Sequence, residues 1–307
     1  MADQHSWPAL PLAEWQDTLY NLHRWTQIVG KTALALSPMQ NHWWQTTLHV
    51  DPRGLRTPLL HTRGRAFEVE FDFMGDSLII RTDDGERRAF ALEPMSVADF
   101  HSRYHALLEG LGIQVKYHPV PNEIEPATPF ARDRTHVSYD AAAVRRCARI
   151  LLDADRVLRA FRGRFIGKSS PVHFWWGAFD LACTRFSGRT APVHPGGFPH
   201  LPDGVTREAY SHECISAGWW PGNPGGPVTE PAFYAYVYPE PAGCPDATVR
   251  PTAAHWHLGL HEWVLPYDAV RTAKDPDQAL MEFLQSTYEA GANLAGWPRA
   301  ELERPAS

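Results

Sequence analysis

The order of hydrophobic periodicities constrains the fold of this chain most, because the same order occurs twice. In residues 12–29 apolar side chains recur every three or four positions, which predicts an amphipathic helix that ends at Gly30. Alternating stretches then predict strands at 41–50 and 66–73 and a hairpin over 77–92, where Asp-Gly lies between two alternating runs. A second helical stretch covers residues 96–113. The first part of the chain is therefore expected to fold as helix, sheet, helix.

The second part repeats this order. A long helix is predicted for residues 138–165 and another for 275–296. Between them, alternating or aromatic stretches predict strands at 170–187, 210–217, 232–239 and 253–266. Residues 117–135 contain four prolines and no periodicity, which is typical of a connection. We therefore expect a first half over 1–116, a proline-rich connection over 117–135 and a second half over 136–307.

Local sequence also supports a repeat. "QIVGKTALALSPMQNHWW" (27–44) and "RFIGKSSPVHFWW" (164–176) share a helix end, Gly-Lys, Ser-Pro and an aromatic stretch with histidine. Self-similarity of this kind suggests an internal duplication. The expected fold class is α+β, with two similar half-domains, each an antiparallel or mixed sheet flanked by helices, related by a pseudo-twofold axis. A pocket at their junction is the default position for a functional site.

Composition excludes several classes of protein. The chain has 44% apolar and 21% charged residues, as in globular domains, and its net charge of −6 is spread without a basic stripe. We expect no nucleic-acid partner. The four cysteines form no CxxC pair, which is typical of free thiols in a reducing compartment. The sequence shows no signal peptide and no run of about 18 apolar residues, so we expect a cytoplasmic protein without a membrane partner.

Polar residues in aromatic strands are the candidate catalytic groups. His173, Asp180 and Arg185 lie in the stretch 170–187, where a charged side chain between two apolar layers needs a partner. His212 precedes Glu213, and adjacent residues on a strand point to opposite faces. We expect His212 or His173 to act as general acid or base, and Arg185 to bind an anionic group of the substrate.

Histidines and a carboxylate also raise the possibility of a metal centre. The predicted ligands are His212, Glu213 and His173, or alternatively His255 and His257 from "HWHLGLHEW". Two histidines on one strand face and a carboxylate are ligands that suit a divalent transition metal, iron or zinc. The competing interpretation is a solvated edge strand, because 16 histidines in 307 residues make close pairs common by chance.

Aromatic residues supply the candidate walls of a pocket. Twelve tryptophans are present, and tyrosines alternate along residues 232–239. The residues expected to contact a substrate are Trp175, Trp176, Trp219, Tyr234 and Tyr236. Ordinary packing of a half-buried strand is the alternative interpretation. If the pocket exists, the Gly/Pro-rich residues 221–231 would form its rim.

Several of these segments resemble a known family. "WPALPLAEWQDTLYNLHRWTQIVGK", "LALSPMQNHWW", "FIGKSSPVHFWWGAFDLACTRFSGR", "EAYSHECISAGWWPG", "PAFYAYVYPEP" and "FLQSTYEAGANLAGW" look like a bacterial family catalogued as domain of unknown function 5996. The resemblance covers nearly the whole chain. It implies one unit of about this length and carries no known activity or catalytic residues.

The residues support three classes of function. The first is an enzyme that acts on a small organic molecule in an aromatic pocket between the halves, with or without a metal. The second is a binding module for a small molecule or a protein, without chemistry. The third is a structural homodimer that uses exposed aromatic surface. Convergence of histidine, carboxylate and arginine in one pocket would favour the enzyme.

Overall fold

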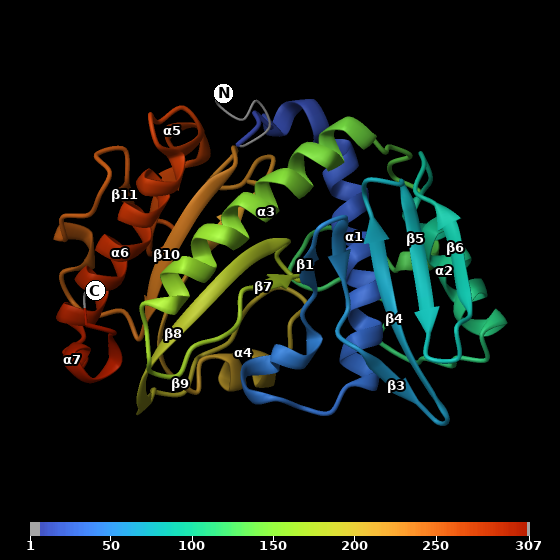
Figure 1. Ribbon diagram of the computed structural model, residues 1–307, viewed down its shortest axis with the longest axis horizontal. Coiled ribbons are helices and arrows are strands. Elements are labelled where there is room, and N and C mark those ends of the chain that lie inside the picture. The colour runs from blue at the N-terminus through green and yellow to red at the C-terminus, as the bar shows by residue number, and fades with distance from the viewer. Residues whose placement is uncertain (1–6, 306–307) are drawn as a thin grey trace.

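The polypeptide forms two antiparallel sheets, each accompanied by helices, in a computed structural model that describes residues 7–305 (Figure 1). The first sheet has the strand order β1-β2-β4-β5-β6, with β3 paired to β4. The second has the order β11-β12-β10-β9-β8-β7. The expected α+β class is therefore confirmed.

The helices and strands have the following bounds. The α-helices are α1 (Leu12–Leu36), α2 (Val97–Gly110), α3 (Ala141–Gly163), α4 (Asp203–Ala209), α5 (Tyr267–Arg271), α6 (Pro276–Leu294) and α7 (Arg299–Leu302), and the 3-10 helices are η1 (Asn41–Thr46), η2 (Phe130–Arg132) and η3 (Cys244–Asp246). The strands of the first sheet are β1 (His49–Asp51), β2 (Gly54–Arg56), β3 (Leu60–Thr62), β4 (Arg65–Asp72), β5 (Ser77–Thr82) and β6 (Arg87–Ala91). Those of the second are β7 (His173–Trp175), β8 (Asp180–Thr190), β9 (His212–Trp220), β10 (Ala232–Tyr238), β11 (His255–His257) and β12 (Glu262–Pro266).

Helices α1 and α2 pack with the first sheet through aromatic residues. Trp25 of α1 stacks on Phe100 of α2 with ring centroids 4.8 Å apart, and Phe71 of β4 stacks on Phe100 at 6.1 Å. The side chain of Ser96 accepts a hydrogen bond from Asp99 N at 3.1 Å and caps α2. The apolar stripe predicted from the sequence is thus the stripe that makes this core.

Helices α3 and α6 cover one face of the second sheet, and Figure 1 shows α3 crossing in front of β8. Residues paired across antiparallel strands share a face, so Cys183, Ala217, Ala235 and Trp263 all lie on this helix face. Gly291 of α6 lies directly on the sheet. The other face carries Ala182, Gly218, Tyr234 and Val264, and we call it the tyrosine face.

Three local predictions are wrong. Helix α1 does not end at Gly30 but continues to Leu36, because its buried stripe continues through Ala33. Residues 41–46 form η1 instead of a strand, with His42 and Trp43 in the left-handed region at φ 55° and 64°. The single strands expected at 170–187 and 253–266 are hairpins, which turn at 176–179 and 258–261.

The two sheets meet at a pair of main-chain hydrogen bonds. Leu48 N donates to Phe174 O at 3.0 Å, and Phe174 N donates to Leu48 O at 2.9 Å. The connection over 117–135 contains only η2 as regular structure and is held to α1 by a buried ion pair between Arg24 and Asp133 at 3.3 Å. The main-chain pair joins the first half to the second sheet, and the ion pair joins the connection to α1.

Two further expectations concern cysteines and membranes. The four cysteines are buried and free, as expected from their spacing. Among the helices of residues 7–305, none is both long enough and apolar enough to cross a membrane.

Candidate functional site

Strand β10 presents three tyrosines on the tyrosine face of the second sheet. The alternation of β10 places Tyr234, Tyr236 and Tyr238 on this face and buries Phe233, Ala235 and Val237 against the helices. Each of the three tyrosines is half-buried, so solvent reaches part of the ring. The rings of Tyr234 and Tyr236 are stacked with centroids 6.2 Å apart. Tyr234 and Tyr236 therefore form a phenolic surface, and the Tyr210 ring packs against Tyr236 and Tyr238 with centroids 6.1 and 5.0 Å away.

Asp180 lies against this surface. It is the first residue of β8, its exposed fraction is 8%, and the hydroxyl of Tyr234 donates a hydrogen bond to its Oδ2. Gly218 of β9 lies beneath, and a Cβ added there would be 2.7 Å from the Tyr234 hydroxyl oxygen. Because glycine has no Cβ, position 218 leaves room for the Tyr234 hydroxyl to reach Asp180. Burial raises the pKa of Asp180 to about 7, although the hydrogen bond from Tyr234 opposes the shift.

Two more carboxyl groups interact with Asp180. Glu262 is the first residue of β12, and Glu123 lies in the connection with φ 63°. Both side chains are half-buried. Burial raises the pKa of Glu123 to about 7 and that of Glu262 to about 8, and the charge on Asp180 adds to both shifts. Three carboxyl groups of the second sheet and the connection therefore have a pKa close to neutral.

Lys31 brings one positive charge that interacts with Glu123. It lies on α1 with an exposed fraction of 2%, and its Nζ donates to Asn122 Oδ1. The ammonium is 5.6 Å from the centre of the Trp176 ring. Burial lowers the pKa of Lys31 to about 8, and the charge on Glu123 opposes this shift. We call Lys31, Glu123, Asp180, Tyr234 and Glu262 the carboxyl–tyrosine cluster.

Gln27 holds the segment that carries Glu123. Its amide accepts from Asn122 N at 2.8 Å and donates to Asn122 O at 2.8 Å. The same Nε2 group donates to Gly177 O at 3.1 Å, and Glu123 N donates to Pro199 O at 3.0 Å. Helix α1 and the loop before β9 thus fix the backbone around Glu123, in a left-handed conformation that is uncommon for a residue with a side chain.

The cluster has the properties of a proton-transfer site. Groups whose pKa is close to neutral exchange protons readily at neutral pH, and strongly shifted groups concentrate at functional sites. Carboxyls that raise each other's pKa are also a known arrangement for dividing acid and base roles. The phenolic surface beside them can contact the apolar part of an organic molecule.

The structure brings some of the residues predicted from the sequence together. Asp180, Tyr234 and Tyr236 lie on one face, and Trp176 lies beside Lys31. Trp175 is half-buried on β7 and is paired with Asp180 across the strands. Trp219, in contrast, is fully buried on the helix face, so it belongs to the core.

Arg185 lies on the other side of the sheet from Asp180. Its exposed fraction is 1%, and its guanidinium carbon is 3.5 Å from the centre of the Phe161 ring and 4.3 Å from that of Tyr288. Its Nη2 donates to Phe161 O at the end of α3. Arg185 therefore stabilises the aromatic core and the helix end, and the structure does not bring it to Asp180.

The three metal ligands predicted from the sequence have separate surroundings. His173 is buried, with its ring 5.6 Å from that of His49, and burial lowers its pKa to about 3. His212 lies 5.8 Å from the His42 ring, whereas Glu213 accepts hydrogen bonds from Ser187 and Arg189 at 2.9 and 2.8 Å. The structure thus gives His212 and Glu213 separate partners.

The alternative pair, His255 and His257, lies on the edge strand β11. His255 is exposed, and His257 accepts a hydrogen bond from Leu260 N at 3.2 Å. Within residues 7–305 no group of three or more His, Cys, Asp or Glu side chains is arranged to hold a metal ion.

Sequence reasoning missed Lys31, Glu123 and Glu262. Lys31 follows the helix end expected at Gly30, and its position on the continued stripe of α1 is the signal that marks it. Glu262 pairs with His257 across the turn at 258–261, so its face depends on that turn. Glu123 lies in a segment without periodicity, so nothing local marks it.

The fold and the cluster together define a protein with an α+β architecture in which α1, the connection and the second sheet bring titratable side chains together. The sequence adds the family. Residues 7–304 match a family described as "Family of unknown function (DUF5996)", and the chain belongs to it. This match confirms the resemblance inferred from the sequence segments. No curated protein and no solved structure matches the chain.

Proposed function

We propose that this protein is an enzyme that acts on a small organic molecule at the carboxyl–tyrosine cluster. Asp180 transfers a proton to or from the substrate, and Glu123 and Glu262 set its protonation state through their charges. The apolar part of the substrate packs on Tyr234 and Tyr236. The observation that carries the proposal is the buried carboxyl of Asp180, whose pKa is raised to about 7 while a tyrosine hydroxyl orients it.

The charges of the cluster limit the net charge that a substrate can carry. The cluster holds three carboxyl groups and one ammonium, so a bound anion would add to the repulsion among the acids. A neutral polar or cationic molecule fits these charges better. Metal chemistry is not part of the proposed step, which uses only the protons on the side chains of the cluster.

The test is a conversion assay without a known substrate. The purified full-length chain is incubated with an extract of polar bacterial metabolites, and mass spectrometry follows which compounds disappear and which accumulate. We expect conversion of at least one compound, and a rate at least about tenfold lower for Asp180→Asn, because general acid–base groups contribute about 10²-fold or more. Asp83→Asn, which makes the same change on an exposed turn, should convert at the wild-type rate.

Two outcomes would contradict the proposal. The first is equal conversion by the wild-type chain and Asp180→Asn, and the second is no conversion by the wild-type chain. A compound that stays bound in native mass spectrometry but is not converted would support the binding module instead. The stacked tyrosine surface is the observation that favours this second candidate.

We also infer that the two halves arose by duplication. Both sheets contain a five-strand meander, β1-β2-β4-β5-β6 and β7-β8-β9-β10-β12, between a first and a last long helix. Each Gly-Lys pair also lies against a tryptophan of the other half: Lys31 Nζ is 5.6 Å from the Trp176 ring, and Lys168 Nζ is 5.6 Å from the Trp44 ring. A pseudo-twofold arrangement accounts for this exchange.

A further inference from the structure

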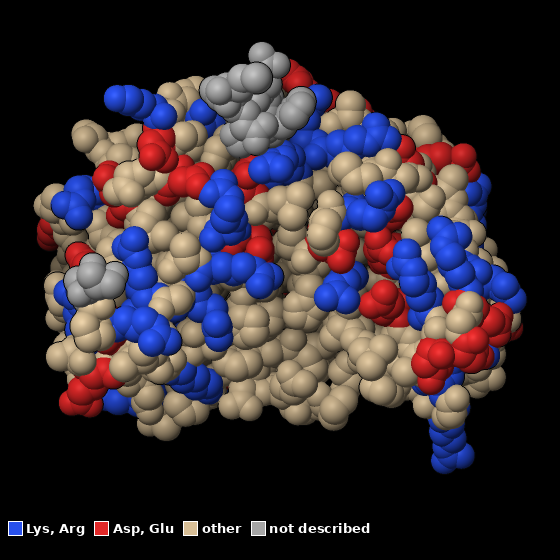
Figure 2. Space-filling view, in the orientation of Figure 1, with Lys and Arg blue, Asp and Glu red and all other residues tan. Residues whose placement is uncertain are grey.

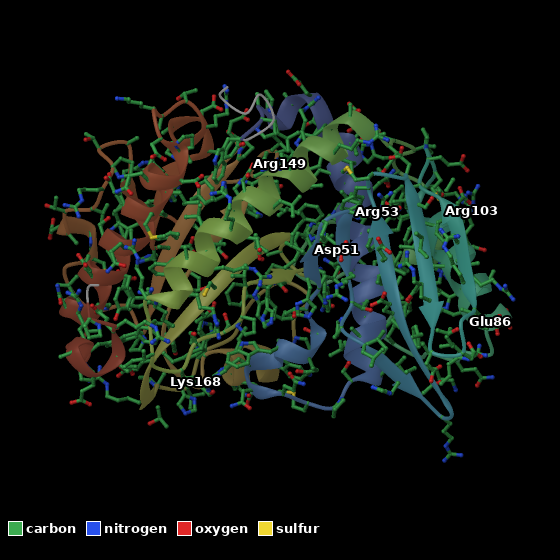
Figure 3. The ribbon with its side chains drawn as sticks, viewed as in Figure 1. Asp51, Arg53, Glu86, Arg103, Arg149 and Lys168 are labelled. Carbon is green, nitrogen blue, oxygen red and sulfur yellow. The ribbon has the colours of Figure 1, made fainter. Side chains whose placement is uncertain are left out.

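A second polar site lies at the end of α3, away from the acids of the carboxyl–tyrosine cluster. It is a pocket of about 440 Å³, and its lining includes Trp44, Arg162, Phe165, Lys168, Ser169 and Arg304. We call it the basic pocket. Figure 3 labels Lys168 between the lower ends of β8 and β9 and helix α4, and Figure 2 shows lysine and arginine side chains gathered over α3 and β8.

The charges in this pocket are all positive. Its lining contains Arg162, Lys168 and Arg304 and no aspartate or glutamate. None of the three cations has a carboxylate within ion-pair distance in residues 7–305, although most arginines of α3 do. Glu208 acts on Lys168, and its Oε1 accepts a hydrogen bond from His42 N. An anion would therefore find positive charge that no side chain neutralises by direct contact.

Both arginines are already oriented by main-chain contacts. Arg162 Nε donates to Ser170 O at 2.7 Å, and Arg304 Nε donates to Gly163 O at 2.8 Å. The Nη groups of both side chains have no hydrogen-bond partner in the described part of the chain, so they remain free to donate. A guanidinium whose Nε is fixed and whose Nη groups are free can bind a phosphate or carboxylate with little further ordering.

Lys168 donates a hydrogen bond to a neutral histidine, which fixes the position of its ammonium group. His42 Nδ1 lies 3.1 Å from Glu208 O and 3.0 Å from Ala209 O, so this nitrogen carries the proton and donates. His42 Nε2 is then the acceptor of a hydrogen bond from Lys168 Nζ at 2.6 Å. Burial, together with the charge on Lys168, lowers the pKa of His42 and keeps the imidazole neutral. The ammonium retains two further N–H groups for a ligand.

Trp44 adds an aromatic wall. Its side chain is half-buried, and its ring centre is 5.6 Å from Lys168 Nζ. A volume of about 440 Å³ lies within the usual range of about 300–1,000 Å³ for small-molecule sites and exceeds what a lone inorganic ion fills. We propose that the basic pocket binds an organic phosphate, whose phosphate group is held by Arg162, Lys168 and Arg304 and whose planar part stacks on Trp44.

Calorimetric titration of the full-length chain with phenyl phosphate tests this proposal. Phenyl phosphate combines a dianion with a planar ring, and inorganic phosphate, benzoate and phenol separate the two contributions. We expect phenyl phosphate to bind more tightly than inorganic phosphate, benzoate or phenol. Arg304→Gln and Lys168→Gln should each raise the Kd for phenyl phosphate at least about tenfold. Arg304 is exposed, so its variant tests the proposal even if Lys168→Gln folds poorly.

Arg164→Gln is the matched control. Arg164 is exposed beside the pocket but does not line it, and its replacement removes the same charge. Its Kd should stay within about twofold of the wild-type value, because only long-range attraction changes. The proposal is overturned if phenyl phosphate does not bind, if Arg164→Gln weakens binding as much as Arg304→Gln, or if benzoate binds more tightly.

Discussion

Replacing Asp180 with asparagine is expected to make the stability of the chain much less sensitive to pH between pH 4 and pH 8. The pKa of Asp180 is raised from 3.8 to about 7 in the folded state. The unfolded chain therefore releases this proton at a lower pH than the folded chain, and wild-type stability falls as the pH rises through this window. Three pKa units correspond to about 4 kcal/mol, which is an upper bound, and asparagine has no proton to lose.

Urea unfolding at several pH values measures this effect. Relative to Asp180→Asn, the free energy of unfolding of the wild-type chain should fall by about 2–4 kcal/mol from pH 4 to pH 8. The charge on Asp180 also raises the pKa of Glu123 and Glu262. Asp180→Asn removes this charge and should therefore lower the pKa of both glutamates, which further reduces the pH dependence of stability. The Asp83→Asn curve should follow the wild-type curve. Parallel curves for wild type and Asp180→Asn would show that Asp180 does not titrate near pH 7.

Replacing Gly30 with alanine is expected to lower the free energy of unfolding by about 1–3 kcal/mol, the usual range for overpacking a core. Alanine ordinarily stabilises a helix relative to glycine by about 1 kcal/mol, so the expected sign is the reverse of the usual one. A Cβ at position 30 would collide with the indole of Trp176. That indole is buried and donates from Nε1 to Thr46 O at 2.7 Å, so it has little room to move.

Gly110→Ala provides the control for this substitution. Gly110 ends α2, and a Cβ added there would have nothing within 4 Å. Its thermal unfolding midpoint should be unchanged or slightly higher than that of the wild-type chain, whereas that of Gly30→Ala should be clearly lower. If both variants shift the midpoint by the same amount, the contact between Trp176 and position 30 of α1 does not determine the effect of the substitution.

The sequence predicts the elements whose periodicity is local. Helices α2, α3 and α6 and strands β4 and β10 follow directly from apolar spacing. The turns at 176–179 and 258–261 escape this reasoning because aromatic residues continue through the first and leucines through the second. Their left-handed residues are Phe179 at φ 59° and His261 at φ 58°, where glycine or asparagine is the usual signal. Both hairpins are therefore read as single strands.

The candidate site is only partly accessible from sequence. Asp180 is marked by its charge in an apolar strand, and Tyr234 and Tyr236 by their alternation. Glu123 and Glu262 join them only through the path of the connection and the register of β12. Contacts between distant segments have no local signal, so sequence reasoning assigns a partner to Asp180 without identifying it.

The exchange of tryptophans between the halves has a consequence for how this chain can be divided. A fragment that ended before the connection would keep Lys31 and Trp44, and the remaining fragment would keep Lys168 and Trp176. Each fragment would then contain one lysine without the indole that this lysine contacts. The pairing of Leu48 with Phe174 would be lost as well. Neither half is therefore expected to form these contacts alone, and an isolated half would need a second molecule to complete them.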